Sequence, residues 1–152
     1  ASPPQLLLER ERGMIARYTT GVEALPGLRP FIDRFRSRLR LAVATSSPKR
    51  FTDVLLPALG VAEAFDVVQT GDDVVHGKPA PEIYLKCMAR LDVAPAECVV
   101  LEDSLAGALA GQRAGAHVIA VPTHLTADED FGFADARATD LFEAADQLET
   151  LL

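Results

Sequence analysis

The chain has 152 residues, of which 49% are hydrophobic and 24% charged, so it can bury one substantial core as a single globular domain. A net charge of −7 argues against an electrostatic nucleic-acid surface and against a polybasic membrane patch. No apolar run approaches the roughly 18 residues of a membrane span. Cys87 and Cys98 form no CxxC motif, which favours two buried thiols in a cytoplasmic protein over a disulfide.

The first third of the chain predicts two helices, a strand and a third helix. Pro3 and Pro4 suit a helix entrance, and an apolar stripe from Leu7 to Tyr18 continues at helical spacing until Gly21. The next three elements are an amphipathic helix over Leu28–Arg38, a buried strand over Leu39–Ala44, and a helix from Pro48 to Leu59, with Ser47 as N-cap and Gly60 after its end.

Strands and helices go on alternating through the rest of the chain. We expect strands at Phe65–Gln69, Cys98–Leu101 and His117–Val121, helices at Pro81–Leu91 and Ser104–Ala114, and a last helix capped by Thr139 or Asp140. This alternation predicts an α/β fold, a doubly wound, Rossmann-like parallel sheet flanked by helices. Ligands of such sheets bind beyond the carboxyl ends of the strands.

Polar residues follow three of these strands. Thr45-Ser46-Ser47 follows the first, Lys78 lies in the polar loop after the second, and Glu102-Asp103 follows the third. Carboxylates bind hard cations such as Mg²⁺, while an ammonium and a hydroxyl can hold phosphoryl oxygens. Each feature alone has a simpler reading: a helix cap, an exposed loop lysine, or acids stabilised by a helix N-terminus. The order and spacing of the three together favour a site.

The segment from Gly71 to Lys78 superficially resembles a phosphate-binding Walker loop. Five residues separate Gly71 from Gly77 instead of four, Pro79 replaces the Ser/Thr, and Asp72 and Asp73 would repel phosphate. We therefore exclude a P-loop.

Three ordered segments resemble motifs of the haloacid-dehalogenase-like (HAD) hydrolases, in the branch of phosphatases and β-phosphoglucomutase-like proteins with a helical cap. The similar stretches are Leu41–Ser47, Gly71–Tyr84 with Lys78 as the family lysine, and Val99–Ser104 followed by Gly107 and Ala114-Gly115. The resemblance implies that Lys78 and Thr45 are catalytic. It also implies that Thr45, Ser46, Ser47 and Lys78 bind the substrate phosphate, and that Asp103 and Glu102 serve Mg²⁺. Lys78 is further expected to pair with Glu102 or with the nucleophile.

The chain departs from the family at its beginning. Family members open with a strand that ends in Asp-x-Asp, whose first Asp attacks phosphorus, and nothing before Thr45 has that form. By resemblance, residues 1–20 are expected to be a remnant of the helical cap and residues 21–152 the core domain without its first strand. The missing strand would leave a groove between the strands that carry Thr45 and Glu102. We therefore expect a homodimer through this open edge or the cap helix.

The resemblance implies a Mg²⁺-dependent phosphatase or phosphomutase that acts on a small phosphorylated metabolite through an aspartyl-phosphate. Without the nucleophile, this chain alone is expected to be inactive, and an added Asp-x-Asp segment to restore turnover. A non-catalytic HAD-like binding or interaction protein fits the same sequence. A receiver-like fold fits less well, because its acid pair should precede its lysine.

Overall fold

A computed structural model describes residues 5–8 and 27–152, and it confirms the predicted α/β fold. Six parallel strands form one sheet in the order β3-β2-β1-β4-β5-β6. The strands are β1 (Gln5–Leu8), β2 (Leu41–Ala44), β3 (Val67–Gln69), β4 (Cys98–Glu102), β5 (His117–Ala120) and β6 (Ala136–Arg137). The α-helices are α2 (Leu28–Phe35), α3 (Lys49–Ala58), α4 (Glu82–Leu91), α5 (Leu105–Ala114) and α6 (Leu141–Glu149). Short 3₁₀ turns lie at Ala62–Ala64, Gly71–Asp73 and Pro95–Glu97.

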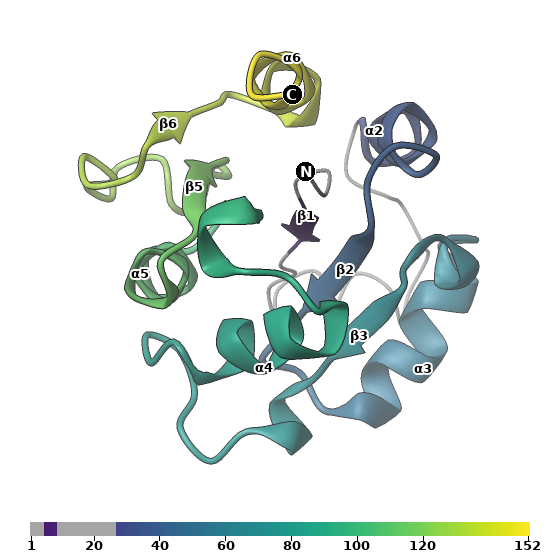
Figure 1. Cartoon of the computed structure of the whole chain (residues 1–152). Coiled ribbons are helices and arrows are strands. Elements are labelled where there is room, and N and C mark those ends of the chain that lie inside the picture. The colour runs from purple at the N-terminus through teal and green to yellow at the C-terminus, as the bar shows by residue number, and fades with distance from the viewer. Residues whose placement is uncertain (1–4, 9–26) are drawn as a thin grey trace.

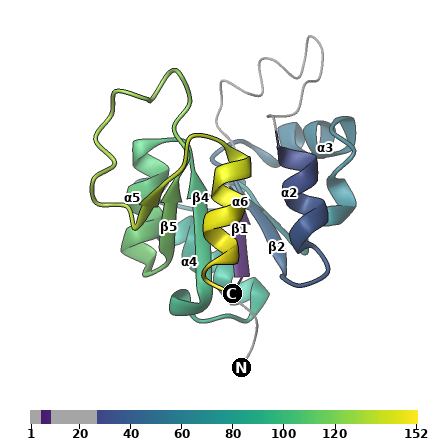
Figure 2. The same ribbon diagram turned by 90° about the horizontal axis from the view of Figure 1, so that it is seen from above.

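The sheet separates two hydrophobic cores. Successive strand side chains point to opposite faces, so Leu41 and Val43 of β2 enter one core while Ala42 and Ala44 enter the other. Helices α2, α3 and α6 contribute to the first core, and α4 and α5 to the second. Figure 2 shows α2 and α6 on one side of the sheet and α5 on the other. This burial on both faces explains the continuous apolar runs of the central strands.

The main correction to the sequence prediction concerns β1. Residues 5–8 were expected to begin a cap helix, but they form a strand between β2 and β4 (Figure 1). A short run such as Gln-Leu-Leu-Leu suits either element, and in this slot its backbone pairs with both neighbouring strands. The rest of the predicted cap remnant lies outside the described residues.

The groove expected between the strands that carry Thr45 and Glu102 is therefore filled. Within the described part of the chain, the open edges of the sheet belong to β3 and β6. Since β1 occupies the central position, an open groove there is no longer a reason to predict a homodimer.

Smaller differences concern element ends and caps. The predicted helix over 28–38 ends at Phe35, and β6 was missed because a two-residue strand in a polar loop leaves no periodic pattern. Ser47 was wrong as the N-cap of α3, since Pro48 occupies that position in extended backbone. Asp140 does cap α6, accepting a hydrogen bond from the Glu143 N–H.

In residues 5–8 and 27–152, no helix has the length and apolar character needed to cross a bilayer.

Candidate active site

Two of the predicted site residues directly follow central strands. β1 pairs with β2 on one side and β4 on the other, with Leu8 level with Val43 and Leu101. Thr45 and Asp103 come directly after β2 and β4, and they are only 1% and 7% exposed. Because the strands are parallel, both residues lie at the same carboxyl edge of the sheet.

The Thr45-Ser46-Ser47 turn is fixed by the chain around it. The Thr45 hydroxyl oxygen accepts a hydrogen bond from the Ser47 N–H at 3.1 Å, and the Ser47 carbonyl accepts one from the Gly71 N–H at 3.0 Å. A Cβ at Gly71 would lie 2.2 Å from the Ser46 carbonyl oxygen, so this position requires glycine. The Ser47 hydroxyl is buried and has no hydrogen-bond partner among the described residues.

Lys78 lies in a loop that Glu82 holds in place. The Glu82 carboxylate accepts hydrogen bonds from the backbone N–H groups of His76 and Val75, which lower the pKa of this carboxyl. The Lys78-Pro79 peptide bond is cis. From this loop the Lys78 side chain turns into the protein, where it is 5% exposed.

The Lys78 ammonium joins the ends of two separate strands. It lies 2.8 Å from Glu102 Oε1, at the end of β4, and it donates to the Ala44 carbonyl, at the end of β2, across 3.3 Å. Ala44 and Glu102 directly precede Thr45 and Asp103. The structure therefore brings the three predicted clusters to one end of the sheet, and the expected Lys78–Glu102 ion pair is present.

Both oxygens of the fully buried Glu102 carboxylate have partners inside the protein. Oε1 accepts hydrogen bonds from Lys78 and from the Tyr84 hydroxyl, and Oε2 accepts one from the Ser104 hydroxyl at 3.1 Å. The carboxylate rests against Gly107, where an added Cβ would lie 2.1 Å from its atoms. Ser104 in turn caps α5 by accepting a hydrogen bond from the Gly107 N–H.

Sequence reasoning missed several of these supporting residues. Tyr84 and Ser104 stand in stretches that resemble the family motifs, but the sequence assigns neither of them a role in the site, and it gives no signal at Thr126. The Thr126 hydroxyl donates to the Asp103 carbonyl at 2.7 Å and so fastens the loop after β5 to the site. No local pattern signals a contact across 23 residues.

The residues present fit a hard cation in part. Asp103 and Glu102 supply carboxylate oxygens, the donor type that Mg²⁺ prefers. The partners of both Glu102 oxygens favour a role in holding Lys78, which leaves Asp103 as the better candidate ligand. In the described ranges, no three His, Cys, Asp or Glu side chains lie together, but Mg²⁺ usually binds through one or two carboxylates, with water and phosphate oxygens completing its ligands.

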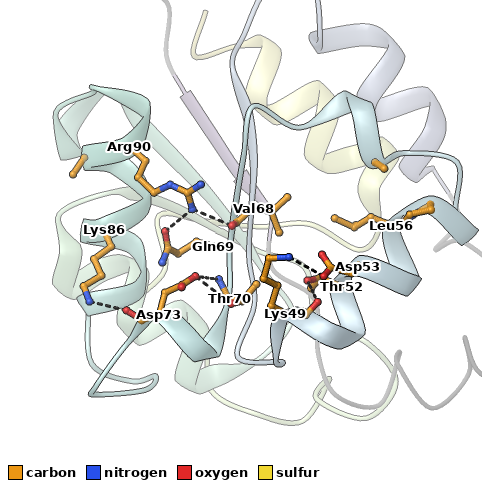
Figure 3. Close-up of a pocket in the computed structure, with 13 residues that line it drawn as sticks. Lys49, Thr52, Asp53, Leu56, Val68, Gln69, Thr70, Asp73, Lys86 and Arg90 are labelled. Atoms are coloured by element: carbon orange, nitrogen blue, oxygen red, sulfur yellow. Dashed lines mark hydrogen bonds and ion pairs between the residues drawn. The ribbon is translucent and has the colours of Figure 1, made fainter.

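A separate groove of about 700 Å³ lies beside β3, between α3 and α4 (Figure 3). It includes none of the predicted site residues. Its charged groups bond within the protein: Lys49 pairs with Asp53, and Arg90 donates to the Val68 carbonyl and to Gln69. The polar groups of this groove therefore already have partners within the protein, and we assign the groove no ligand.

Comparisons with known proteins agree with this arrangement. The family model for haloacid dehalogenase-like hydrolases matches residues 3–115. Protein CbbY of Rhodobacter capsulatus is 40% identical over 130 residues, covering 83% of this chain and 57% of CbbY. The fructose-1-phosphate phosphatase YqaB of Escherichia coli is 35% identical over 119 residues, covering 78% of this chain and 63% of YqaB.

A solved structure gives the same result. CbbY from Rhodobacter sphaeroides, crystallised with phosphate, superimposes with a TM-score of 0.77 at 37% identity, covering 85% of this chain and 60% of that protein. The chain thus spans roughly three fifths of the length of these relatives. The matching family model, these identities and the shared fold show that the chain belongs to the phosphatase branch of the haloacid-dehalogenase-like hydrolases.

Proposed function

We propose that this chain carries the phosphate- and cation-binding part of a Mg²⁺-dependent phosphoryl-transfer site for a small phosphorylated metabolite. The observation that supports this proposal most directly is the position of the Lys78 ammonium. It lies 2.8 Å from Glu102 Oε1 and 3.3 Å from the Ala44 carbonyl oxygen. This buried ammonium bonds to the two residues that directly precede Thr45 and Asp103. It can offset the negative charge of a phosphoryl group bound there.

Each residue of the site has a proposed role. The Thr45 hydroxyl and the Ser46-Ser47 segment bind phosphoryl oxygens, and the buried Ser47 hydroxyl is available as a donor to them. Lys78 binds a further oxygen and neutralises its charge. Asp103 holds Mg²⁺, with Glu102 beside it, and the bound ion would supply further charge neutralisation of the phosphoryl group.

The covalent part of the reaction needs an aspartate nucleophile. The 152 residues contain no Asp-x-Asp ahead of Thr45, and β1 holds no carboxylate. We expect the 152-residue polypeptide to show no turnover by itself, with catalysis through an aspartyl-phosphate belonging to a protein that supplies this aspartate. An added Asp-x-Asp strand would have to take the place of β1 to restore it.

The relatives support this substrate class. Crystals of Rhodobacter sphaeroides CbbY contain phosphate in one case and xylulose-(1,5)bisphosphate in another, and YqaB is a fructose-1-phosphate phosphatase. A cytoplasmic location is part of the proposal, since Cys87 and Cys98 are both free and buried.

A second candidate is a non-catalytic HAD-like protein that binds a phosphorylated metabolite or a partner. The observation that favours it is that no Asp-x-Asp precedes Thr45 in the 152 residues. Phosphate binding without turnover, in a protein shown to be full length, would support this candidate. A homodimer also stays a proposal, which light scattering can test.

The proposed function is tested by calorimetric titration of the purified chain with inorganic phosphate, with and without Mg²⁺. We expect Mg²⁺ to tighten phosphate binding, and Lys78→Met to weaken it about tenfold or more, as expected for the loss of a charged contact. Lys86→Met is the matched control, because Lys86 is half-exposed and pairs with Glu82 on the surface. Equal phosphate affinity in the wild type and Lys78→Met would refute the proposal, and hydrolysis of an aryl phosphate by this chain would refute its inactivity.

A further inference from the structure

Tyr84 is completely buried at the base of the proposed site, although it was expected only to fill the core. It lies on α4, its exposed fraction is 0%, and its hydroxyl donates a hydrogen bond to Glu102 Oε1. The same oxygen lies 2.8 Å from the Lys78 ammonium. A single carboxylate oxygen therefore links Tyr84 to Lys78.

The Tyr84 ring makes a second contact with this lysine. The Lys78 Nζ atom lies 4.9 Å from the centroid of the ring, within the range of a cation–π interaction. The hydroxyl of Tyr84 thus fixes the anionic partner of Lys78, while its ring contacts the cation itself. Such a double contact with both members of a buried ion pair goes beyond ordinary core packing.

Lys78 needs this support because of its chemistry. A lysine side chain has a flexible four-carbon stem, and its ammonium does not set its own direction. Glu102 is also flexible, but the Ser104 hydroxyl holds Oε2 and Gly107 leaves room for the carboxylate. Tyr84 adds a further restraint from α4, because its hydroxyl bonds to Glu102 and its rigid ring contacts the Lys78 ammonium.

We propose that Tyr84 is a positioning residue that holds the Lys78 ammonium towards the phosphoryl pocket. The proposal rests on the function proposed above, and it gives Tyr84 no direct contact with the substrate. Tyr84 acts through Glu102 and through its ring face. Removing the hydroxyl alone should therefore affect Lys78 less than removing the ring as well.

The first test observes the lysine directly. The chain has three lysines, Lys49, Lys78 and Lys86, so ¹⁵N-lysine labelling gives three side-chain signals in an NMR spectrum. The side chain of Lys78 is 5% exposed, against 68% and 46% for the other two. We expect only the Lys78 ammonium protons to exchange slowly enough with water to be seen at neutral pH.

The variants separate the two contacts of Tyr84. Tyr84→Phe keeps the ring and should shift the Lys78 ammonium signal, whereas Tyr84→Leu should remove the signal by exposing the ammonium to water. Met88→Leu is the control, because Met88 is buried one turn further along the same face of α4. A Lys78 signal that is unchanged in Tyr84→Phe, or that changes equally in Met88→Leu, would overturn the proposal.

The second test measures phosphate affinity in the same variants. We expect Tyr84→Phe to weaken binding of inorganic phosphate by about tenfold, with Met88→Leu unchanged. Wild-type affinity in a folded Tyr84→Phe protein would contradict the positioning role. Failure of the proposed function is distinguishable, because Lys78→Met would then bind phosphate as the wild type does. The lysine spectra would still show whether Tyr84 holds Lys78.

Discussion

Replacing Gly107 by alanine tests the packing of the site most sharply, because two effects of opposite sign compete. Gly107 is the third residue of α5, and within helices alanine is favoured over glycine by up to about 1 kcal/mol. Propensity alone would therefore make Gly107→Ala stabilising. However, the added Cβ would lie 2.1 Å from the Glu102 carboxylate, closer than real Cβ contacts come.

The carboxylate cannot move aside without cost. Lys78, Tyr84 and Ser104 all bond to it. Disrupting a buried ion pair typically costs about 3–5 kcal/mol, so after the gain in helix propensity we expect Gly107→Ala to lower the free energy of unfolding by about 2–4 kcal/mol. Urea unfolding followed by far-UV circular dichroism measures this value, since the chain contains no tryptophan to serve as a fluorescent probe.

Two controls identify the cause. Gly77→Ala places its Cβ in open space and should change the free energy of unfolding by less than about 0.5 kcal/mol. Against a Glu102→Ala background the obstacle is gone, so Gly107→Ala should become neutral or stabilising. A stabilising effect in the wild type, or the same loss in both backgrounds, would refute the reasoning.

Three further predictions concern other parts of the molecule. The Glu82 carboxylate accepts hydrogen bonds from two backbone N–H groups, which lower its pKa in the folded protein. The stability that Glu82 contributes is therefore complete above the pKa of this carboxyl in the unfolded chain, and it is lost as pH falls through the lower pKa of the folded state. Glu82→Gln should therefore flatten the acid side of a plot of urea midpoint against pH, and an acid side as steep as that of the wild type would contradict this reasoning. Burial raises the pKa of the Cys87 thiol to about 12, and it also raises the pKa of the Cys98 thiol. A thiol reagent at mildly alkaline pH should label neither cysteine until the chain unfolds, and rapid labelling of the native protein would contradict their burial. Asp140→Ala removes the cap of α6 and should cost about 1 kcal/mol in thermal or urea unfolding, with an unchanged midpoint as the contrary result.

The predictability of the fold follows from the strength of the local patterns. Strands buried on both faces, such as Leu41–Ala44, leave continuous apolar runs, and helices such as Glu82–Leu91 leave an apolar stripe. Both were therefore predicted with nearly correct limits. The sequence predicts a helix at residues 5–8 because Leu7 and Leu8 open an apolar stripe at helical spacing, but the pairing with β2 and β4 makes this segment a strand.

The residues of the site also differ in how far the sequence predicts them. Lys78, Thr45 and Glu102-Asp103 were found because parallel strands bring their carboxyl ends to one edge. Their supporting residues depend on contacts between distant segments. Tyr84 lies 18 residues before Glu102, and its apolar neighbours on α4 gave it the appearance of an ordinary core residue.

The central claim is that Thr45, Lys78 and Asp103 surround one cation and phosphate pocket, and paramagnetic broadening tests it most directly. Mn²⁺ can replace Mg²⁺ at oxygen ligands, and it broadens NMR signals of nearby nuclei. With inorganic phosphate present, we predict that the backbone amide signals of Thr45 and Asp103 and the Lys78 ammonium signal broaden together, and that Asp103→Asn abolishes the effect. Broadening centred elsewhere, or unchanged in Asp103→Asn, would contradict the account.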